Sequence, residues 1–134
     1  MGSIGELRGI HPKEATRLRK AGVRTTESLL RHASTKRGRN ALAKATDLDP
    51  DQLLDWVNRA DLMRIKGVGA EYADLLKVVG VDTVKALRRR NPRSLLGSMV
   101  EANEERRLVR RLPTESMVAA WVDAAADVEP AVSS

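Results

Sequence analysis

The apolar residues of this chain recur at intervals of three and four positions, which is the spacing of helices with one buried face. Two stretches, residues 7–29 and 65–87, place apolar residues, glycines and threonines in the same order and register. The matching residues stand 58 positions apart: Gly9 and Gly67, Ile10 and Val68, Ala15 and Ala73, Leu18 and Leu76, Gly22 and Gly80, Val23 and Val81, Thr25 and Thr83, and Leu29 and Leu87. A register shared over 23 residues indicates an internal repeat.

Each copy predicts two helices joined by a glycine turn. Gly22 and Gly80 follow the last residue of the first helix, where a positive φ suits a helix end. Thr25 and Thr83 then stand where a hydroxyl caps the next helix. The apolar residue that opens each copy is expected to end an earlier short helix. The loop at the start of each copy is therefore a hairpin between two helices.

This order of parts resembles the helix-hairpin-helix motif. The second copy matches the motif throughout, at Ile65, Gly67, Val68, Gly69, Ala73, Leu76, Gly80, Val81 and Thr83. The first copy departs from it where His11 replaces the second glycine of the loop and Pro12 follows. Proline suits a first helical position. A left-handed backbone at His11 would be strained, so the first hairpin is expected to be distorted.

The wider chain resembles a bacterial family of tandem helix-hairpin-helix proteins known as a domain of unknown function. The likeness covers roughly residues 4–125 and is carried by LLRHASTKRGRNALAKATDL, LLDWVNRADLMRIKGVGAEYADLLKVVGVDTVKAL and RRNPRSL. Together with the repeat, it predicts an all-α fold of two duplicated helix-hairpin-helix units, with additional helices packed around a shared aliphatic core. The expected units are residues 1–60 and 61–128, and residues 129–134 are expected to form a frayed C-terminal tail.

Start signals and apolar spacing predict further helices outside the two copies. They are expected at 36–46, from Asp49-Pro50-Asp51 towards Asn58, at 60–65, from Asn91-Pro92, at 104–112, and from Pro113-Thr114-Glu115. Trp56 and Trp121 fall in two similar helices, each downstream of one copy. Tryptophan among aliphatic residues at helical spacing is usually buried, so both are expected to fill equivalent core space.

Charge is distributed unevenly along the chain. All 24 lysines and arginines lie at or before Arg111, whereas residues 112–134 carry four acidic residues and no basic one. A basic body suits a polyanionic partner, although charged helix surfaces are also common without one.

The chain has no cysteine, so disulfides and thiolate chemistry are excluded. No apolar run approaches the length of a membrane span, and no signal peptide is evident. We therefore expect a cytoplasmic protein with no membrane partner.

Helix-hairpin-helix loops suit phosphate because their glycines let a ligand approach the backbone and because the following helix presents unpaired N–H groups. The candidate contacts are Lys66, Gly67, Val68, Gly69, Ala70 and Lys77 in the second copy, and Arg8, Gly9, Ile10, His11 and Lys13 in the first. The resemblance implies two such loops gripping DNA across a minor groove. Contacts of this kind do not distinguish base sequence.

Local charge differs between the two loops. The first carries the more favourable local charge, whereas Glu71 and Asp74 flank the second and would repel phosphate. Supporting positive charge is expected from residues 36–39, 88–90 and 106–111.

Two other classes of function are compatible with helical repeats or must be compared with the side chains present. The same helical repeats suit a protein-protein interaction or scaffold module. An enzyme is not expected, because the only histidines, His11 and His32, have no metal-ligand spacing and the aspartates at 49 and 51 are explained by helix capping. No cofactor is expected, although the resemblance admits a monovalent cation held by hairpin carbonyls.

Overall fold

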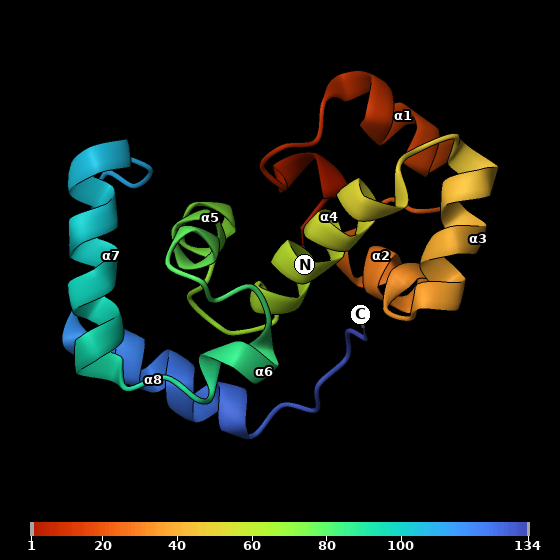
Figure 1. The fold of residues 1–134 in the computed structure, drawn as a ribbon. Coiled ribbons are helices and arrows are strands. Elements are labelled where there is room, and N and C mark those ends of the chain that lie inside the picture. The colour runs from red at the N-terminus through yellow and green to blue at the C-terminus, as the bar shows by residue number, and fades with distance from the viewer. Residues whose placement is uncertain (1, 134) are drawn as a thin grey trace. The chain divides into compact units, whose positions relative to one another are not determined.

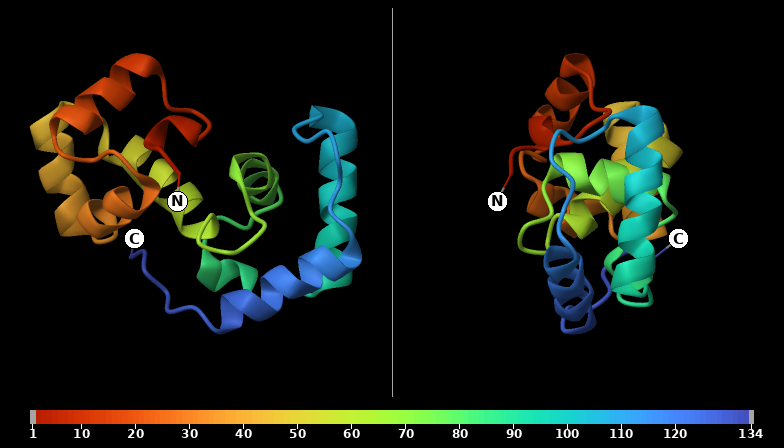
Figure 2. Two further views of the ribbon diagram at one scale, coloured as in Figure 1. Left: turned by 180° about the vertical axis from the view of Figure 1, so that it is seen from behind. Right: turned by 90° about the vertical axis from the view of Figure 1, so that its left-hand side faces the viewer.

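The computed structural model describes residues 2–133, and these residues form an all-α fold with no β-strand. A short 3-10 helix, η1, and eight α-helices follow one another along the chain (Figures 1 and 2). Their bounds are η1 Ile4–Glu6, α1 Pro12–Lys20, α2 Thr26–Ala33, α3 Lys36–Thr46, α4 Pro50–Leu62, α5 Ala70–Val78, α6 Val84–Leu87, α7 Pro92–Arg106 and α8 Glu115–Ala126. The all-α prediction is confirmed.

The chain divides into two compact units. The first comprises the residues up to Asp61 together with those from Ala131 onwards, and the second is Leu62–Pro130. The boundary falls at the end of α4, so each unit contains one of the two segments that share the 58-residue register.

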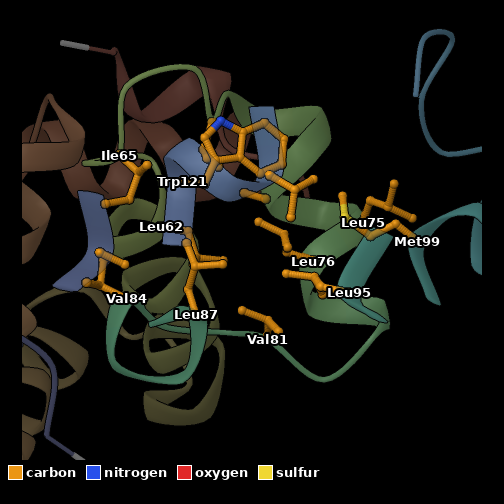
Figure 3. Packing of buried hydrophobic residues seen from close by; sticks show 14 of the residues in the cluster. Leu62, Ile65, Leu75, Leu76, Val81, Val84, Leu87, Leu95, Met99 and Trp121 are labelled. Atoms are coloured by element: carbon orange, nitrogen blue, oxygen red, sulfur yellow. The ribbon is translucent and has the colours of Figure 1, made fainter. Parts of the chain in front are cut away.

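The second unit is built around a cluster of buried side chains. Figure 3 shows Leu75 and Leu76 of α5, Leu95 and Met99 of α7 and Trp121 of α8 in this cluster. Helix α8 packs against both α6 and α7, and α5 packs against α7. Burial of this aliphatic and indole surface is the main source of the unit's stability.

The first unit has buried side chains of the same kind. Helices α2 and α3 pack against each other, and the N-terminal segment joins the turn before α2 through a hydrogen bond of 3.1 Å from the Ile4 amide to the Arg24 carbonyl. The residues that are completely buried include Leu18, Leu29, Leu53 and Val57.

Most predicted helix starts are confirmed. The helix at 36–46 is α3, and the starts expected around Pro50, Pro92 and Thr114 are those of α4, α7 and α8. The prediction of a separate helix at 60–65 is wrong, because α4 continues to Leu62 and a turn follows it.

The basic helix predicted at 104–112 is also wrong. Helix α7 ends at Arg106, and Arg107 adopts a left-handed backbone with φ of 50°. The side chain of Asn103 then pairs with Val109 twice, accepting from its amide at 3.0 Å and donating to its carbonyl at 3.2 Å. This pairing folds residues 107–114 back as a loop and buries the Val109 side chain.

Within residues 2–133, no helix has both the length and the apolar surface that crossing a membrane requires.

Candidate nucleic-acid interface

The loops that precede α1 and α5 have nearly the same backbone. Gly9 has φ of 90° and Gly67 has φ of 91°, and glycine adopts such values without strain. A tight turn comes before each loop: the amide of Leu7 donates to the carbonyl three residues earlier at 3.2 Å, and that of Ile65 does the same at 3.1 Å. The two hairpins therefore turn the chain in the same way.

The glycine turns after α1 and α5 match as well. Gly22 and Gly80 have φ of 90° and 91°, and each amide donates three residues back at 3.0 Å. The next amides, of Val23 and Val81, donate five residues back at 2.9 Å and 2.8 Å. This pair of bonds satisfies the last carbonyls of a helix, and it confirms the predicted glycine ends.

The predicted threonine caps are confirmed too. The hydroxyl of Thr25 accepts from the Ser28 amide at 3.0 Å, and that of Thr83 accepts from the Ala86 amide at 3.1 Å. These bonds satisfy one free donor at the start of α2 and of α6.

A tryptophan packs against each hairpin. A Cβ at Gly9 would lie 3.8 Å from Nε1 of Trp56, and a Cβ at Gly67 would lie 3.0 Å from Nε1 of Trp121. Both indoles are almost completely buried. Each indole therefore supports the loop of its own unit from the core side, and at Gly67 the missing side chain also leaves room for it.

The distortion expected at His11 is absent. His11 has φ of −84° and ψ of 158°, and Gly69 at the matching position has φ of −91° and ψ of −172°. Both are extended conformations that any residue adopts. Only the first glycine of each loop needs a left-handed backbone, so histidine at the second position causes no strain.

The first turn of α1 carries its own carboxylate. Oε1 of Glu14 accepts a hydrogen bond of 2.9 Å from the amide of His11. Pro12 occupies the first helical position and has no N–H. The positive end of α1 is thus partly neutralised by an acidic residue of the same helix.

The first turn of α5 is arranged differently. Tyr72 stands where α1 has Glu14, and its hydroxyl donates to the carbonyl of Arg111 at 2.8 Å. The first intrahelical bond of α5 runs from the Ala73 amide to the Gly69 carbonyl at 2.9 Å, so the preceding amides have no acceptor within the helix. Glycine at the N-cap adds no side chain that would cover them.

A hollow of about 440 Å³ opens at this end of α5. It is lined by the loop glycines, by the first turn of α5 and by two arginines from the loop after α7. Its lining residues are Gly67, Gly69, Ala70, Glu71, Tyr72, Arg110 and Arg111. The lining therefore contains one carboxylate, that of Glu71, and two guanidinium groups, those of Arg110 and Arg111. This combination of backbone, helix end and arginine suits a phosphate.

The hairpin of the first unit also borders a hollow, of about 670 Å³. Its walls come from the first turns of α1 and from the loop between α3 and α4. Arg17 of α1 connects the two by donating a hydrogen bond to the Asp47 carbonyl at 3.2 Å. Its lining residues are His11, Pro12, Lys13, Glu14, Arg17, Asp47, Leu48, Asp49 and Gln52. With three carboxylates among them, this hollow is less positive than its counterpart, which reverses the expectation from local sequence.

The candidate contacts do not all face the hollows. Lys66 is exposed in the turn before Gly67, but Val68 is buried and its amide donates to the Ile65 carbonyl at 3.0 Å. Lys77 lies in the last turn of α5, at the opposite end of the helix from the loop. In the first unit, Lys13 lines the hollow, Gly9 is exposed, and Arg8 and Ile10 are half-buried.

The structure adds one residue that the sequence pattern did not identify, Tyr72. Arg110 and Arg111 were among the residues expected to supply supporting positive charge, but from a helix at 104–112 and not from a loop. Their position depends on the loop that the Asn103–Val109 pairing creates. The signal available in the sequence was the difference between Glu14 and Tyr72 at matching positions of the two copies.

Among residues 2–133, no group of three or more histidine, cysteine or acidic side chains is placed to hold a metal ion. A family described as a domain of unknown function, DUF4332, matches residues 8–128. No curated protein and no solved structure matches the chain.

Proposed function

The chain belongs to the DUF4332 family of domains of unknown function, and we propose that it binds the phosphate backbone of DNA without regard to base sequence. In this proposal, residues 7–29 and 65–87 are duplicated helix-hairpin-helix motifs of a cytoplasmic bacterial protein. The contact is made mainly by the hairpin of the second unit, and the function is binding without catalysis.

The hollow at the start of α5 carries the proposal. It brings exposed loop glycines, the amide end of a helix and two arginines to one place. Amides and the helix dipole attract an anion, and guanidinium groups match phosphate oxygens with paired donors. The bond from Tyr72 to the Arg111 carbonyl ties the arginine loop to the helix, so the donors are held together before a ligand arrives.

The first hairpin plays a smaller part in this proposal. Glu14 already occupies the positive end of α1, and Asp47 and Asp49 add negative charge to the same hollow. Lys13 and Arg17 offset that charge only in part. We expect this hairpin to contribute less to the affinity for phosphate than the hairpin of the second unit does.

A protein partner is the second candidate function. The hollow of the first unit favours it, because its wall combines both signs of charge with the apolar side chain of Leu48. Mixed charge around an apolar centre is compatible with a protein interface, whereas phosphate binding depends on an excess of basic side chains. Such binding would depend on the first unit and respond weakly to salt.

Fluorescence anisotropy with a labelled DNA duplex over a salt series tests the proposal. Counterion release gives a slope of about −0.9 in log affinity against log salt for each phosphate contact. The double variant Arg110→Gln, Arg111→Gln is expected to bind more weakly and to reduce the slope by up to about 2.

The matched control removes two positive charges elsewhere on the same unit. Lys85 and Arg89 are exposed near α6 and do not line the hollow. The double variant Lys85→Gln, Arg89→Gln should retain most of the affinity and the slope. Equal losses in the two double variants would assign the binding to overall charge, and no binding of the wild type at low salt would refute the DNA proposal.

A further inference from the structure

Arg39 is buried near the start of α3, with only 3% of its surface exposed. Arg39 of α3 occupies the position of Leu95 in α7, because each residue stands four positions after the N-cap of its helix. The amide of each donates to the carbonyl of that N-cap residue at 2.9 Å. Leu95 is completely buried in the core of the second unit. The first unit therefore has an arginine at a position where the second has a core leucine.

A buried guanidinium is unfavourable unless its donors are satisfied. Nη1 of Arg39 donates to the carbonyls of Ala33 at 3.1 Å and Ser34 at 3.0 Å, at the end of α2. Nη2 donates to the carbonyl of Ser133. Burial lowers the pKa of the Arg39 guanidinium, but arginine keeps its charge in proteins. The near-terminal segment thus supplies an acceptor to a charge that is otherwise shielded from water.

Ser133 is held through both of its backbone groups. Its amide donates to the Ser34 carbonyl at 2.8 Å and its hydroxyl to the same carbonyl at 3.4 Å, while its own carbonyl accepts from Arg39. A residue held by its N–H and its C=O is recognised mainly as peptide backbone, and the longer hydroxyl bond of Ser133 adds a smaller side-chain contact.

The neighbouring side chains are small and uncharged. Ala131 and Val132 are half-buried, whereas Ser133 is exposed. The apolar surface that this segment buries therefore belongs to residues 131 and 132, whereas its polar contacts come from residue 133.

We propose that Arg39 and the Ser34 carbonyl form a peptide-binding site on the first unit, and that the chain's own segment 131–133 is its resident ligand. The site takes an extended peptide backbone with small neutral side chains. A chain that lacks this segment binds such a peptide from another molecule. Neither the site nor its ligand involves the hairpin hollow of the second unit, so this site and the DNA proposal stand or fall separately.

The test uses a chain that stops at Pro130 and a labelled synthetic peptide of residues 127–134, DVEPAVSS. The shortened chain is expected to bind the peptide at least ten times more tightly than the full-length chain, in which the resident segment competes at high effective concentration. Equal binding by the two chains, or none by a folded shortened chain, would overturn the proposal.

Two peptide variants test the contact while the protein is unchanged. A peptide with Ser133→Pro lacks the amide donor and is expected to lose at least tenfold in affinity, whereas Ser133→Ala keeps the amide and should retain most of the affinity. Equal affinities for these two peptides would contradict the backbone clamp.

A second measurement keeps the proposal testable if the shortened chain does not fold. Hydrogen exchange of the full-length protein should show the Ser133 amide protected, because it is bonded to the Ser34 carbonyl. The variant Arg39→Met should reduce this protection while α3 remains helical by circular dichroism. Exchange of the Ser133 amide at the unprotected rate in the wild type would overturn the proposal.

Discussion

The indole nitrogen of Trp121 lies so close to Gly67 that a Cβ on this glycine would be 3.0 Å from it, tighter than most real Cβ contacts. In the first unit the corresponding distance, from a Cβ on Gly9 to Nε1 of Trp56, is 3.8 Å, which is ordinary contact. The hairpin of the second unit is therefore packed more tightly on its tryptophan, and the two glycines should tolerate substitution differently.

Gly67→Ala is expected to destabilise the protein more than Gly9→Ala. Both variants place a side chain on a left-handed backbone, which costs about 1–2 kcal/mol. Only Gly67→Ala adds a close contact with an indole. Chemical denaturation of the two variants measures the difference in unfolding free energy, and equal losses would contradict the tighter packing of the second hairpin.

The two tryptophans report on the two units separately, because Trp56 lies in α4 and Trp121 in α8. In the variant Trp121→Phe, the remaining fluorescence comes from Trp56 and follows the first unit, whereas circular dichroism follows the whole chain. We expect the denaturation midpoint to fall less when it is measured by fluorescence than when it is measured by circular dichroism. The reciprocal variant Trp56→Phe is the control. Identical shifts for both probes would show that the units unfold as one.

The threonine caps should contribute alike in the two units. Thr25→Ala and Thr83→Ala each remove one hydroxyl acceptor from an amide, at a cost of about 1 kcal/mol. Serine at either position keeps the acceptor and should retain most of the stability. A loss in only one of the two alanine variants, measured by thermal unfolding, would show that the matched geometry does not imply matched energetics.

Asn103 is expected to affect DNA binding without contacting the DNA. Its side chain makes two hydrogen bonds with Val109 and so holds the loop that carries Arg110 and Arg111. Asn103→Ala leaves every positive charge in place but frees this loop, which should reduce the affinity several-fold. The control Glu104→Ala changes an exposed neighbour of α7. Unchanged affinity in Asn103→Ala would show that the two arginines need no positioning.

Glu14→Gln should strengthen DNA binding at the first hairpin. The amide oxygen of glutamine still accepts from the His11 amide, but the negative charge at the start of α1 is removed. We expect a modest rise in affinity at low salt. A fall in affinity, measured by the same anisotropy titration, would mean that this carboxylate does not oppose phosphate.

Much of the local structure follows from short-range sequence signals. The turns at Gly22 and Gly80 and the caps at Thr25 and Thr83 were predictable because helix ends depend on a few neighbouring residues. The starts at Pro50, Pro92 and Thr114 are signals of the same kind.

The candidate site was less predictable, because part of it is made by distant residues. Local propensity favours a helix through residues 104–112. The side chain of Asn103 instead makes two hydrogen bonds with the backbone of Val109, and the helix ends before Arg107. Only this loop places Arg110 and Arg111 beside the start of α5. Two of the three carboxylates of the first hollow, Asp47 and Asp49, likewise come from a loop about 35 residues further along the chain, which no local pattern associates with the hairpin.

Amide chemical shifts of the labelled full-length protein, followed while a short DNA duplex is added at low salt, show which hairpin contacts the phosphate backbone. We expect the largest changes at Gly67, Gly69, Ala70 and the loop bearing Arg110 and Arg111, with smaller ones at the first hairpin. Changes confined to the first hairpin, or to the surface of α6, would contradict the proposal that the second hairpin holds the phosphate backbone.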